Sequence, residues 1–265
     1  MRLKPCFKRL EAEGRKALIP YILGGDPADK TVDIMHQLVS SGADIIELGF
    51  PFSDPVADGP VIAQAHERAV SHGVTLNDVF SMVSTFRERD NETPIVLMGY
   101  LNPVEIMGYE TFVERASESG VDGVLMVDLP PESAHELLEL LHARGMDMIN
   151  LITPTTSDER IRKICGVASG YLYYVSLKGV TGSSALNVQE VQDRISHIKT
   201  FAEVPVSVGF GIRDGESAAA ISRVADGVIV GTVLVSELAK FSQEGDVCID
   251  RVSDRVADMR LAMDR

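Results

Sequence analysis

Residues 44–60 read DIIELGFPFSDPVADGP, and this stretch decides how the fold is interpreted. An apolar run from Ala43 to Leu48 contains one embedded glutamate, Glu47, as in a buried strand. The loop that follows contains three prolines, which fix backbone geometry at low entropic cost. A strand followed by a rigid loop can hold Glu47 and Asp58 facing one pocket. Paired carboxylates in different environments supply an acid and a base at neutral pH, so we expect a catalytic pair here.

Short β-rich runs recur along the whole chain. The expected strands are 18–23, 44–48, 95–98, 123–127, 148–152, 172–176, 206–208 and 227–230. Most are continuous apolar runs rather than alternating ones, which is typical of parallel strands covered by helices. The segments between them show helical spacing, for example the apolar stripe of Ala134, Leu137, Leu138 and Leu141.

Eight strand–helix units in about 250 residues indicate an α/β fold of the (β/α)8 TIM-barrel type. The alternative, an open doubly wound sheet, needs a GxGxxG turn after its first strand, where residues 24–27 read GGDP. The interval between the second and third strands is the longest, so we expect extra structure there. We predict one domain over 1–265, with the barrel in about 1–240 and extra N-terminal and C-terminal helices.

The C-terminal helix is expected within residues 246–265, after a polar break. Its apolar residues recur at alternating steps of three and four and form a narrow seam. These residues are Ile249, Val252, Val256, Met259 and Met263. We expect the seam to pack on the barrel exterior, and a contact with a partner protein is the alternative.

Composition excludes several classes of function. The net charge of −14 argues against binding to nucleic acid or to anionic membranes. Three scattered cysteines without a CxxC pair fit a reduced cytosol, and the histidines lack metal-ligand spacing. We find no apolar run long enough to span a bilayer and no signal-peptide core. We therefore expect a cytoplasmic protein without a bound metal.

Glycines follow the last three expected strands. Residues 176–184 read SLKGVTGSS, residues 208–212 read VGFGI and residues 230–233 read VGTV. Barrels often bind phosphate with the loops after strands seven and eight and a short helix, where glycine lets backbone N–H groups approach an oxyanion. We expect a phosphate site here, with ordinary turn glycines as the alternative. The loop from Lys178 to about Asn187 is a candidate lid, or else a plain surface loop.

Together these segments resemble the alpha subunit family of tryptophan synthase, from about Phe7 to Leu238. The resemblance is carried by GDP at 25–27, ELGFPFSDPVADGP at 47–60, GVTG at 179–182 and GFGI at 209–212. The segment at 47–60 is the most specific of them. The resemblance implies a lyase of L-tryptophan biosynthesis that cleaves indole-3-glycerol phosphate into indole and glyceraldehyde 3-phosphate.

The resemblance also implies roles for particular residues. Glu47 matches the general acid/base that protonates indole C3 and takes the hydroxyl proton of the glycerol chain, and Asp58 matches the group that binds the indole N–H. Tyr173 matches a supporting tyrosine, and Thr181 a lid threonine that contacts Asp58. Positions matching the substrate pocket are Tyr21, Ile62, Met98, Tyr100, Leu125 and Val127. Positions matching the phosphate site are Gly182, Gly209, Phe210, Gly211, Gly231 and Thr232.

The cleavage reaction itself requires a carboxyl group such as that of Glu47, independently of the family resemblance. Retro-aldol cleavage without a metal or a Schiff-base lysine needs one proton delivered to a carbon and another removed from a hydroxyl. A single carboxyl group with a raised pKa can do both. The apolar neighbours Ile45, Ile46 and Leu48 favour a raised pKa for Glu47.

The family works with a β subunit that holds pyridoxal phosphate, in an α2β2 heterotetramer. By analogy, Pro51, Asp54, Asn102 and Pro103 would face that partner, although Asp54 is also a plausible turn cap before Pro55. We expect no cofactor in this chain, since nothing in it suggests a pyridoxal-phosphate lysine.

Two other functions compete with the lyase. Another barrel enzyme acting on a phosphorylated sugar would use lysines or Asp–Cys pairs at its strand ends, whereas the second strand here ends with Glu47. A catalytically silent protein that only activates a β partner would be signalled by loss of Glu47 or Asp58, and both are present.

Overall fold

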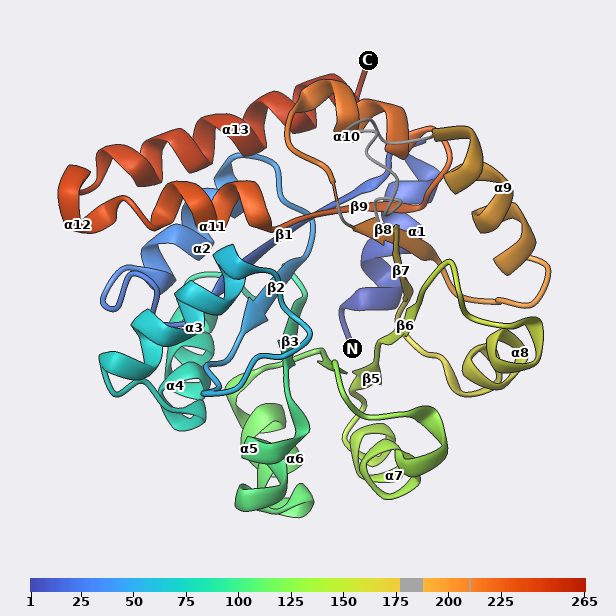
Figure 1. Cartoon of the computed structure of the whole chain (residues 1–265), viewed down its shortest axis with the longest axis horizontal. Helices are drawn as coiled ribbons and strands as arrows, with labels where there is room; N and C mark the ends of the chain where they lie inside the picture. The colour runs from blue at the N-terminus through green and yellow to red at the C-terminus, as the bar shows by residue number, and fades with distance from the viewer. Residues whose placement is uncertain (177–187, 210) are drawn as a thin grey trace.

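The protein is described here from a computed structural model, which covers residues 1–176, 188–209 and 211–265. Within these residues all strand pairs are parallel, in the order β5-β4-β3-β2-β1-β9-β8-β7-β6, and helices surround them (Figure 1). The strands are β1 Ala17–Leu23, β2 Ile46–Gly49, β3 Ile95–Gly99, β4 Gly123–Met126, β5 Asp147–Met148, β6 Asn150–Ile152, β7 Leu172–Val175, β8 Val206–Gly209 and β9 Gly227–Val230. The predicted TIM barrel is confirmed.

The fifth barrel strand is divided into two pieces. We expected one strand over residues 148–152, but β5 pairs with β4 while β6 pairs with β7. Ile149 lies between the pieces, and its N–H still donates to the carbonyl oxygen of Val124 at 2.9 Å. The chain therefore changes partner at Ile149, which brings the two ends of the sheet together and accounts for nine strands at eight barrel positions.

The helices follow the predicted alternation with the strands. They are α1 Leu3–Ala12, α2 Thr31–Ser40, α3 Pro60–Ser71, α4 Leu76–Arg87, α5 Leu101–Met107, α6 Tyr109–Ser119, α7 His135–Ala143, α8 Asp158–Val167, α9 Val188–Ile198, α10 Gly215–Ser222, α11 Thr232–Leu238, α12 Phe241–Glu244 and α13 Val247–Met263. The extra structure expected after the second strand is the pair α3 and α4. A short 3-10 turn, Pro131–Ser133, precedes α7.

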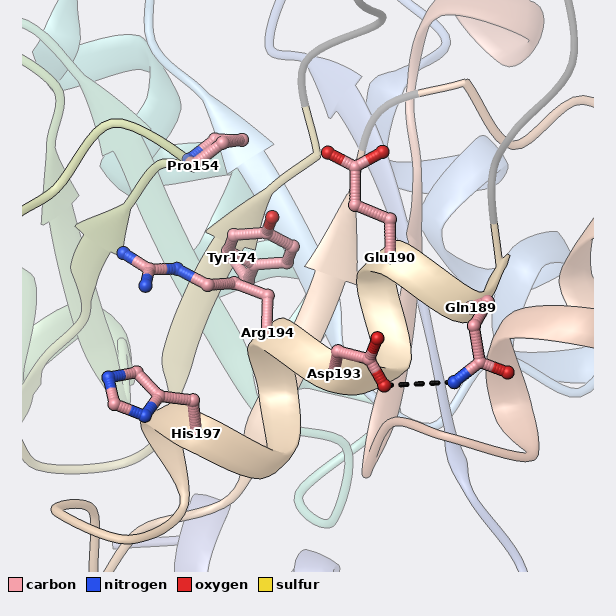
Figure 2. Close-up of a pocket in the computed structure, with 7 residues that line it drawn as sticks. All are labelled: Pro154, Tyr174, Gln189, Glu190, Asp193, Arg194 and His197. Atoms are coloured by element: carbon pink, nitrogen blue, oxygen red, sulfur yellow. Dashed lines mark hydrogen bonds between the residues drawn. The ribbon is translucent and has the colours of Figure 1, made fainter.

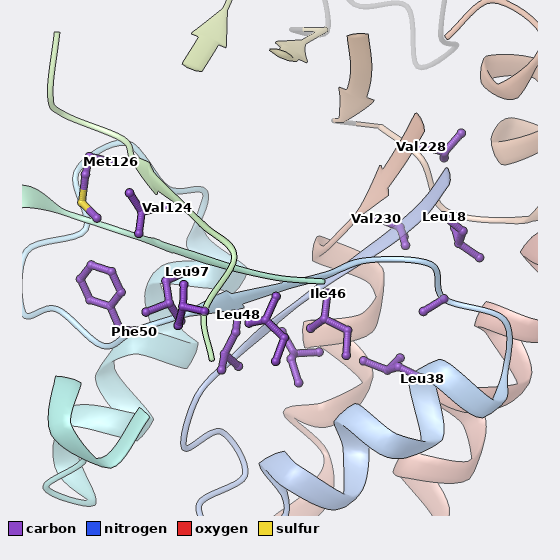
Figure 3. Packing of buried hydrophobic residues seen from close by; sticks show 14 of the residues in the cluster. Leu18, Leu38, Ile46, Leu48, Phe50, Leu97, Val124, Met126, Val228 and Val230 are labelled. Carbon is purple, nitrogen blue, oxygen red and sulfur yellow. The ribbon is translucent and has the colours of Figure 1, made fainter. Parts of the chain in front are cut away.

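The core has two layers, because the strands are buried on both faces. Inside the barrel, Leu3, Phe7 and Leu10 of α1 pack against strand residues such as Ile19, so α1 closes one end of the barrel. Outside it, the strands pack against the surrounding helices, and Figure 3 shows Leu38 of α2 pointing toward the strand that carries Ile46. Burial on both faces explains the continuous apolar runs in the sequence.

The C-terminal helix α13 packs on the barrel exterior, as predicted. It contacts α10, α11 and α2, and Val252, Val256 and Met259 are buried there. Near its end, Arg260 binds Asp44 at 3.0 Å and the Lys16 carbonyl oxygen at 2.9 Å. These contacts join the helix to the barrel wall. The prediction of a single domain over 1–265 remains a prediction that this packing supports.

Aspartates at strand entrances hold neighbouring strands in register. Asp44 accepts the Leu18 N–H at 2.9 Å, and Asp226 accepts the Val206 N–H at 2.9 Å. Asp122 accepts the Ile95 N–H at 3.0 Å in the same way. Asp44 and Asp122 are buried and Asp226 is half-buried, and each fixes one strand against the next by accepting a backbone N–H.

Asp122 is the most heavily used of these carboxylates, and its removal is expected to destabilise the fold. Its second role is to form an ion pair with Arg87 at 2.9 Å. Burial of Arg87 lowers the pKa of its guanidinium to about 10. Asp122→Ala leaves that guanidinium buried without its carboxylate, which typically costs about 3–5 kcal/mol. Urea denaturation should show this loss. The exposed Asp254→Ala should stay within about 0.5 kcal/mol of the parent, and an equally mild effect at Asp122 would contradict the assignment.

Candidate active site

Glu47 is buried in the barrel wall on β2, in register with Tyr21 of β1 and Val96 of β3. Tyr171, the residue immediately before β7, donates its hydroxyl hydrogen to Oε1 of Glu47. The other oxygen, Oε2, is buried and has no hydrogen-bond partner within the described residues. Burial raises the pKa of Glu47 to about 8, and the bond from Tyr171 lowers it only in part. Glu47 is therefore mostly protonated at neutral pH, as its apolar neighbours predicted.

Asp58 lies in the loop between β2 and α3 and is held from the neighbouring strand. The Tyr100 hydroxyl donates to Oδ2 of Asp58 at 2.8 Å and accepts the Ala57 N–H at 3.0 Å. Burial raises the pKa of Asp58, while the bond from Tyr100 lowers it. The carboxylate has a fixed orientation because a single phenol contacts both its oxygen and the adjacent backbone.

Tyrosines dominate the surroundings of the two carboxyl groups. Burial and the nearby Glu47 raise the pKa values of Tyr21, Tyr171 and Tyr173, so their hydroxyls remain protonated at neutral pH. Our sequence reasoning missed the contact of Tyr171 with Glu47. The available signal was that Tyr171 lies two residues before Tyr173, and side chains two apart in a strand point to the same face.

The expected pocket residues fall in two adjoining apolar clusters. Tyr21 and Ile62 share one cluster with Met98, and Met98 also packs with Leu125 and the rest of the barrel interior. The interior cluster further includes Val127 and Tyr173. Met98 thus connects the two clusters, while Tyr100, the remaining expected pocket position, contacts Asp58 instead.

The expected phosphate residues lie after adjacent strands. Gly209 ends β8, Gly231 follows β9 and Thr232 begins α11. A Cβ at Gly209 would lie 2.2 Å from the Tyr173 hydroxyl, so no larger residue fits there without a shift. Gly211 has a φ of 79°, which favours glycine. The other predicted positions, Thr181, Gly182 and Phe210, lie outside the described residues.

The residues predicted to face a partner lie on two neighbouring segments. Asp54 and Asn102 are exposed, Pro103 is half-buried and Pro51 is buried. The segments are joined by the ring of Phe52, which stacks on Tyr100 at 5.2 Å between centroids.

Two apolar side chains stand out in the same region. Val56 is 89% exposed in the Asp58 loop, and Ile106 is 81% exposed on α5. Single exposed apolar residues are common on protein surfaces, so these two positions gain meaning only from a partner.

An open pocket of about 520 Å³ lies elsewhere, against α9 (Figure 2). It is lined by Pro154, Tyr174, Gln189, Glu190, Asp193, Arg194 and His197. Gln189 donates to Asp193 one turn further along α9 at 2.8 Å. Neither Glu47 nor Asp58 borders it, so the carboxyl pair, and not this pocket, marks the candidate active site.

Two further classes of site find no support in the described part of the chain. Across residues 1–176, 188–209 and 211–265, no group of three His, Cys, Asp or Glu side chains is arranged to hold a metal ion. Over the same ranges, no helix has the length and apolar character needed to cross a membrane.

Comparisons with known proteins identify the family of the chain. The family model described as tryptophan synthase alpha chain matches residues 7–264. The chain is 56% identical over 264 residues to the tryptophan synthase alpha chain of Thioalkalivibrio sulfidiphilus, covering 99% of each, and 54% identical to that of Marinobacter nauticus, covering 99% and 98%.

Solved structures show the same similarity. The tryptophan synthase alpha subunit of Legionella pneumophila superposes with a TM-score of 0.93 at 45% identity, over 99% of this chain and 98% of that one. A tryptophan synthase complex of Pyrococcus furiosus gives 0.82 at 35% identity, over 92% and 98%. The match extends past Leu238, where we had expected it to end, so the C-terminal helix is part of the shared fold. The chain belongs to the tryptophan synthase alpha chain family, whose members are lyases of tryptophan biosynthesis.

Proposed function

We propose that this chain cleaves indole-3-glycerol phosphate, with Glu47 as general acid and base and Asp58 as the group that binds the indole N–H. The observation that carries the proposal is the carboxyl pair itself. Glu47 is buried and mostly protonated with one oxygen unpartnered, while Asp58 is held by Tyr100 on the adjacent loop. Two carboxyl groups in different environments suit the two proton transfers of the reaction.

The proposed reaction uses Glu47 for two successive transfers of two different protons. Protonated Glu47 gives its proton to indole C3, and the positive charge that develops on the ring is stabilised by Asp58 at the N–H. The Glu47 carboxylate then takes the proton of the adjacent glycerol hydroxyl. As that C–O bond becomes a carbonyl, the bond to C3 breaks and its electrons restore the indole ring. Glu47 ends protonated, ready for the next turnover.

The substrate phosphate needs local donors, because the chain carries a net charge of −14 and repels anions at long range. We place it beside Gly211, Gly231 and Thr232, where backbone N–H groups at the start of α11 can approach an oxyanion. The indole ring then lies toward the apolar cluster that contains Met98 and Leu125.

A β subunit is the proposed partner, in an α2β2 assembly, with Val56, Ile106 and Asp54 on the contact face. Their exposure supports this, as does the structural similarity to a chain of the Pyrococcus furiosus complex. We further propose that this chain needs no cofactor of its own, that pyridoxal phosphate belongs to the β subunit, and that the protein is cytoplasmic.

The proposal is tested by mixing the purified protein with indole-3-glycerol phosphate and following indole release, first alone and then with a β subunit. Slow release alone that rises with the β subunit supports the lyase. Release in neither condition would favour another reaction on a phosphorylated sugar, or a silent activator of the β subunit.

The pH dependence of cleavage should report the protonation of Glu47. Because Glu47 starts protonated and its pKa is about 8, kcat/KM should fall as pH rises through that value. Tyr171→Phe removes a donor that stabilises the carboxylate, so the pKa rises and this basic limb should move to higher pH, by up to about one unit. The matched control is Tyr174→Phe on β7, three residues after Tyr171, whose side chain lies in the outer layer of the core. A limb that moves equally in both variants, or in neither, contradicts the assignment.

The partner face should respond to a charge at Ile106. Ile106→Asp places a carboxylate where an apolar contact is expected and should weaken binding of the β subunit by about 10-fold or more, measured by titration calorimetry. Indole release by the isolated chain should not change. The control is Leu261→Asp, which changes an exposed apolar residue on the distant helix α13. Equal losses of affinity for the β subunit in both variants would indicate a nonspecific effect.

A further inference from the structure

We propose that His66 is a positioning residue that ties the two ends of the loop over residues 50–59 together and orients the Asp58 carboxylate. This inference rests on the proposed role of Asp58. His66 projects from α3, the helix that follows the loop, and its side chain is only 3% exposed. No signal in the sequence marked it.

One imidazole spans the loop. Its Nδ1 accepts the backbone N–H of Phe52 at 3.1 Å, near the start of the loop. Its Nε2 lies 3.6 Å from Oδ2 of Asp58, near the end. Five residues of chain separate Phe52 from Asp58, and a single rigid ring contacts both of them.

The hydrogen bond from Phe52 also fixes the tautomer. Because Nδ1 accepts a hydrogen bond and so carries no hydrogen itself, the ring hydrogen of neutral His66 lies on Nε2, facing the carboxylate. Burial lowers the pKa of His66 to about 4, so the ring stays neutral at physiological pH. His66 therefore presents a partial positive charge to Asp58 without forming a full ion pair.

Among the described residues around Asp58, His66 and Tyr100 are the two that direct a polar hydrogen at its carboxylate. Tyr100 donates to the same oxygen at 2.8 Å, and its ring meets His66 edge-on at 6.3 Å. Tyr21 and Tyr173 lie on the barrel side, where the charge of Asp58 contributes to their raised pKa values. The nearby cation of α3, Arg68, is bound by both oxygens of Asp26 at 2.8 and 2.7 Å.

Three substitutions separate the two contacts of the ring. Asparagine can place its amide oxygen where Nδ1 lies, so His66→Asn keeps the acceptor for Phe52 and loses the donor to Asp58. Glutamine can reach the place of Nε2, so His66→Gln keeps the donor. His66→Leu removes both contacts. Loss of the donor raises the pKa of Asp58, because one fewer dipole stabilises its charge.

The test is the pH profile of indole release for the wild type and these variants, alone and with a β subunit, beside Asp58→Asn and urea denaturation of each protein. We expect the acid limb of kcat/KM to move up by at least about half a unit in His66→Asn and to stay in place in His66→Gln. We expect kcat to fall about 10-fold or more in His66→Leu. The control is His72→Asn, at the exposed C-cap of the same helix, which should leave kcat and the pH profile unchanged.

Each outcome bears on one claim. An acid limb that stays at the wild-type pH in His66→Asn, while Asp58→Asn is impaired, overturns the inference and leaves the role of Asp58 intact. Loss of activity that only follows loss of stability in the urea experiment also overturns it. If Asp58→Asn is fully active, the proposed role of Asp58 fails first, and the inference about His66 fails with it.

Discussion

Replacing Glu47 with glutamine is expected to lower kcat for indole release by about 10²–10⁴-fold, the usual contribution of a general acid–base group. Glutamine has nearly the same shape, and its amide oxygen can still accept the hydroxyl of Tyr171. It cannot deliver a proton to carbon or take one from a hydroxyl. The loss should therefore appear in kcat, measured under saturating substrate with and without a β subunit.

The same substitution should leave the fold intact, which makes the kinetic result interpretable. The folded state raises the pKa of Glu47, so it binds more protons than the unfolded chain at pH values between about 4.5 and 8. The contribution of Glu47 to the free energy of unfolding therefore falls as pH rises through that window. Glutamine does not titrate, so Glu47→Gln removes this pH dependence. Urea denaturation at pH 7 should show equal or greater stability. A variant that keeps more than about a tenth of wild-type kcat would contradict the role assigned to Glu47.

How much of the fold follows from the sequence is clearest at the fifth strand. The continuous apolar runs placed the other seven strands correctly to within about two residues, because parallel strands buried on both faces are apolar throughout. The division at Ile149 has no local signal. It arises because the barrel closes there, and closure depends on which strands become neighbours in space.

The candidate site divides in the same way. Glu47 and Asp58 were found from local pattern, since a carboxylate inside an apolar strand and a proline-stiffened loop are visible in the sequence. The contacts made by Tyr171 and His66 could not be predicted in this way. Tyr171 is distant in sequence from Glu47, and the contact of His66 with Phe52 depends on the path of the loop. Thr181, Gly182 and Phe210 stay predictions from the family resemblance.

Asp58→Asn is the second substitution with a large expected effect. Asparagine can still accept the hydroxyl of Tyr100, so the loop should keep its position. The variant loses the negative charge that opposes the positive charge developing on the indole ring. Removing one such preorganised electrostatic contact typically lowers kcat by about 10²–10³-fold. Steady-state kinetics of indole release, with and without a β subunit, measure the effect.

Charge and position can be separated within the same loop. Asp54→Asn makes the identical chemical change four residues earlier, at an exposed carboxylate that accepts the neighbouring Ser53 hydroxyl at 2.6 Å. Asp54→Asn should not affect cleavage by the isolated chain, because the charge of Asp54 faces solvent and not the indole ring of the substrate. If both asparagine variants lose activity equally, the effect belongs to the loop as a whole. A loss confined to Asp58, with the acid limb of the pH profile gone, assigns the charge at the indole N–H to this one carboxylate.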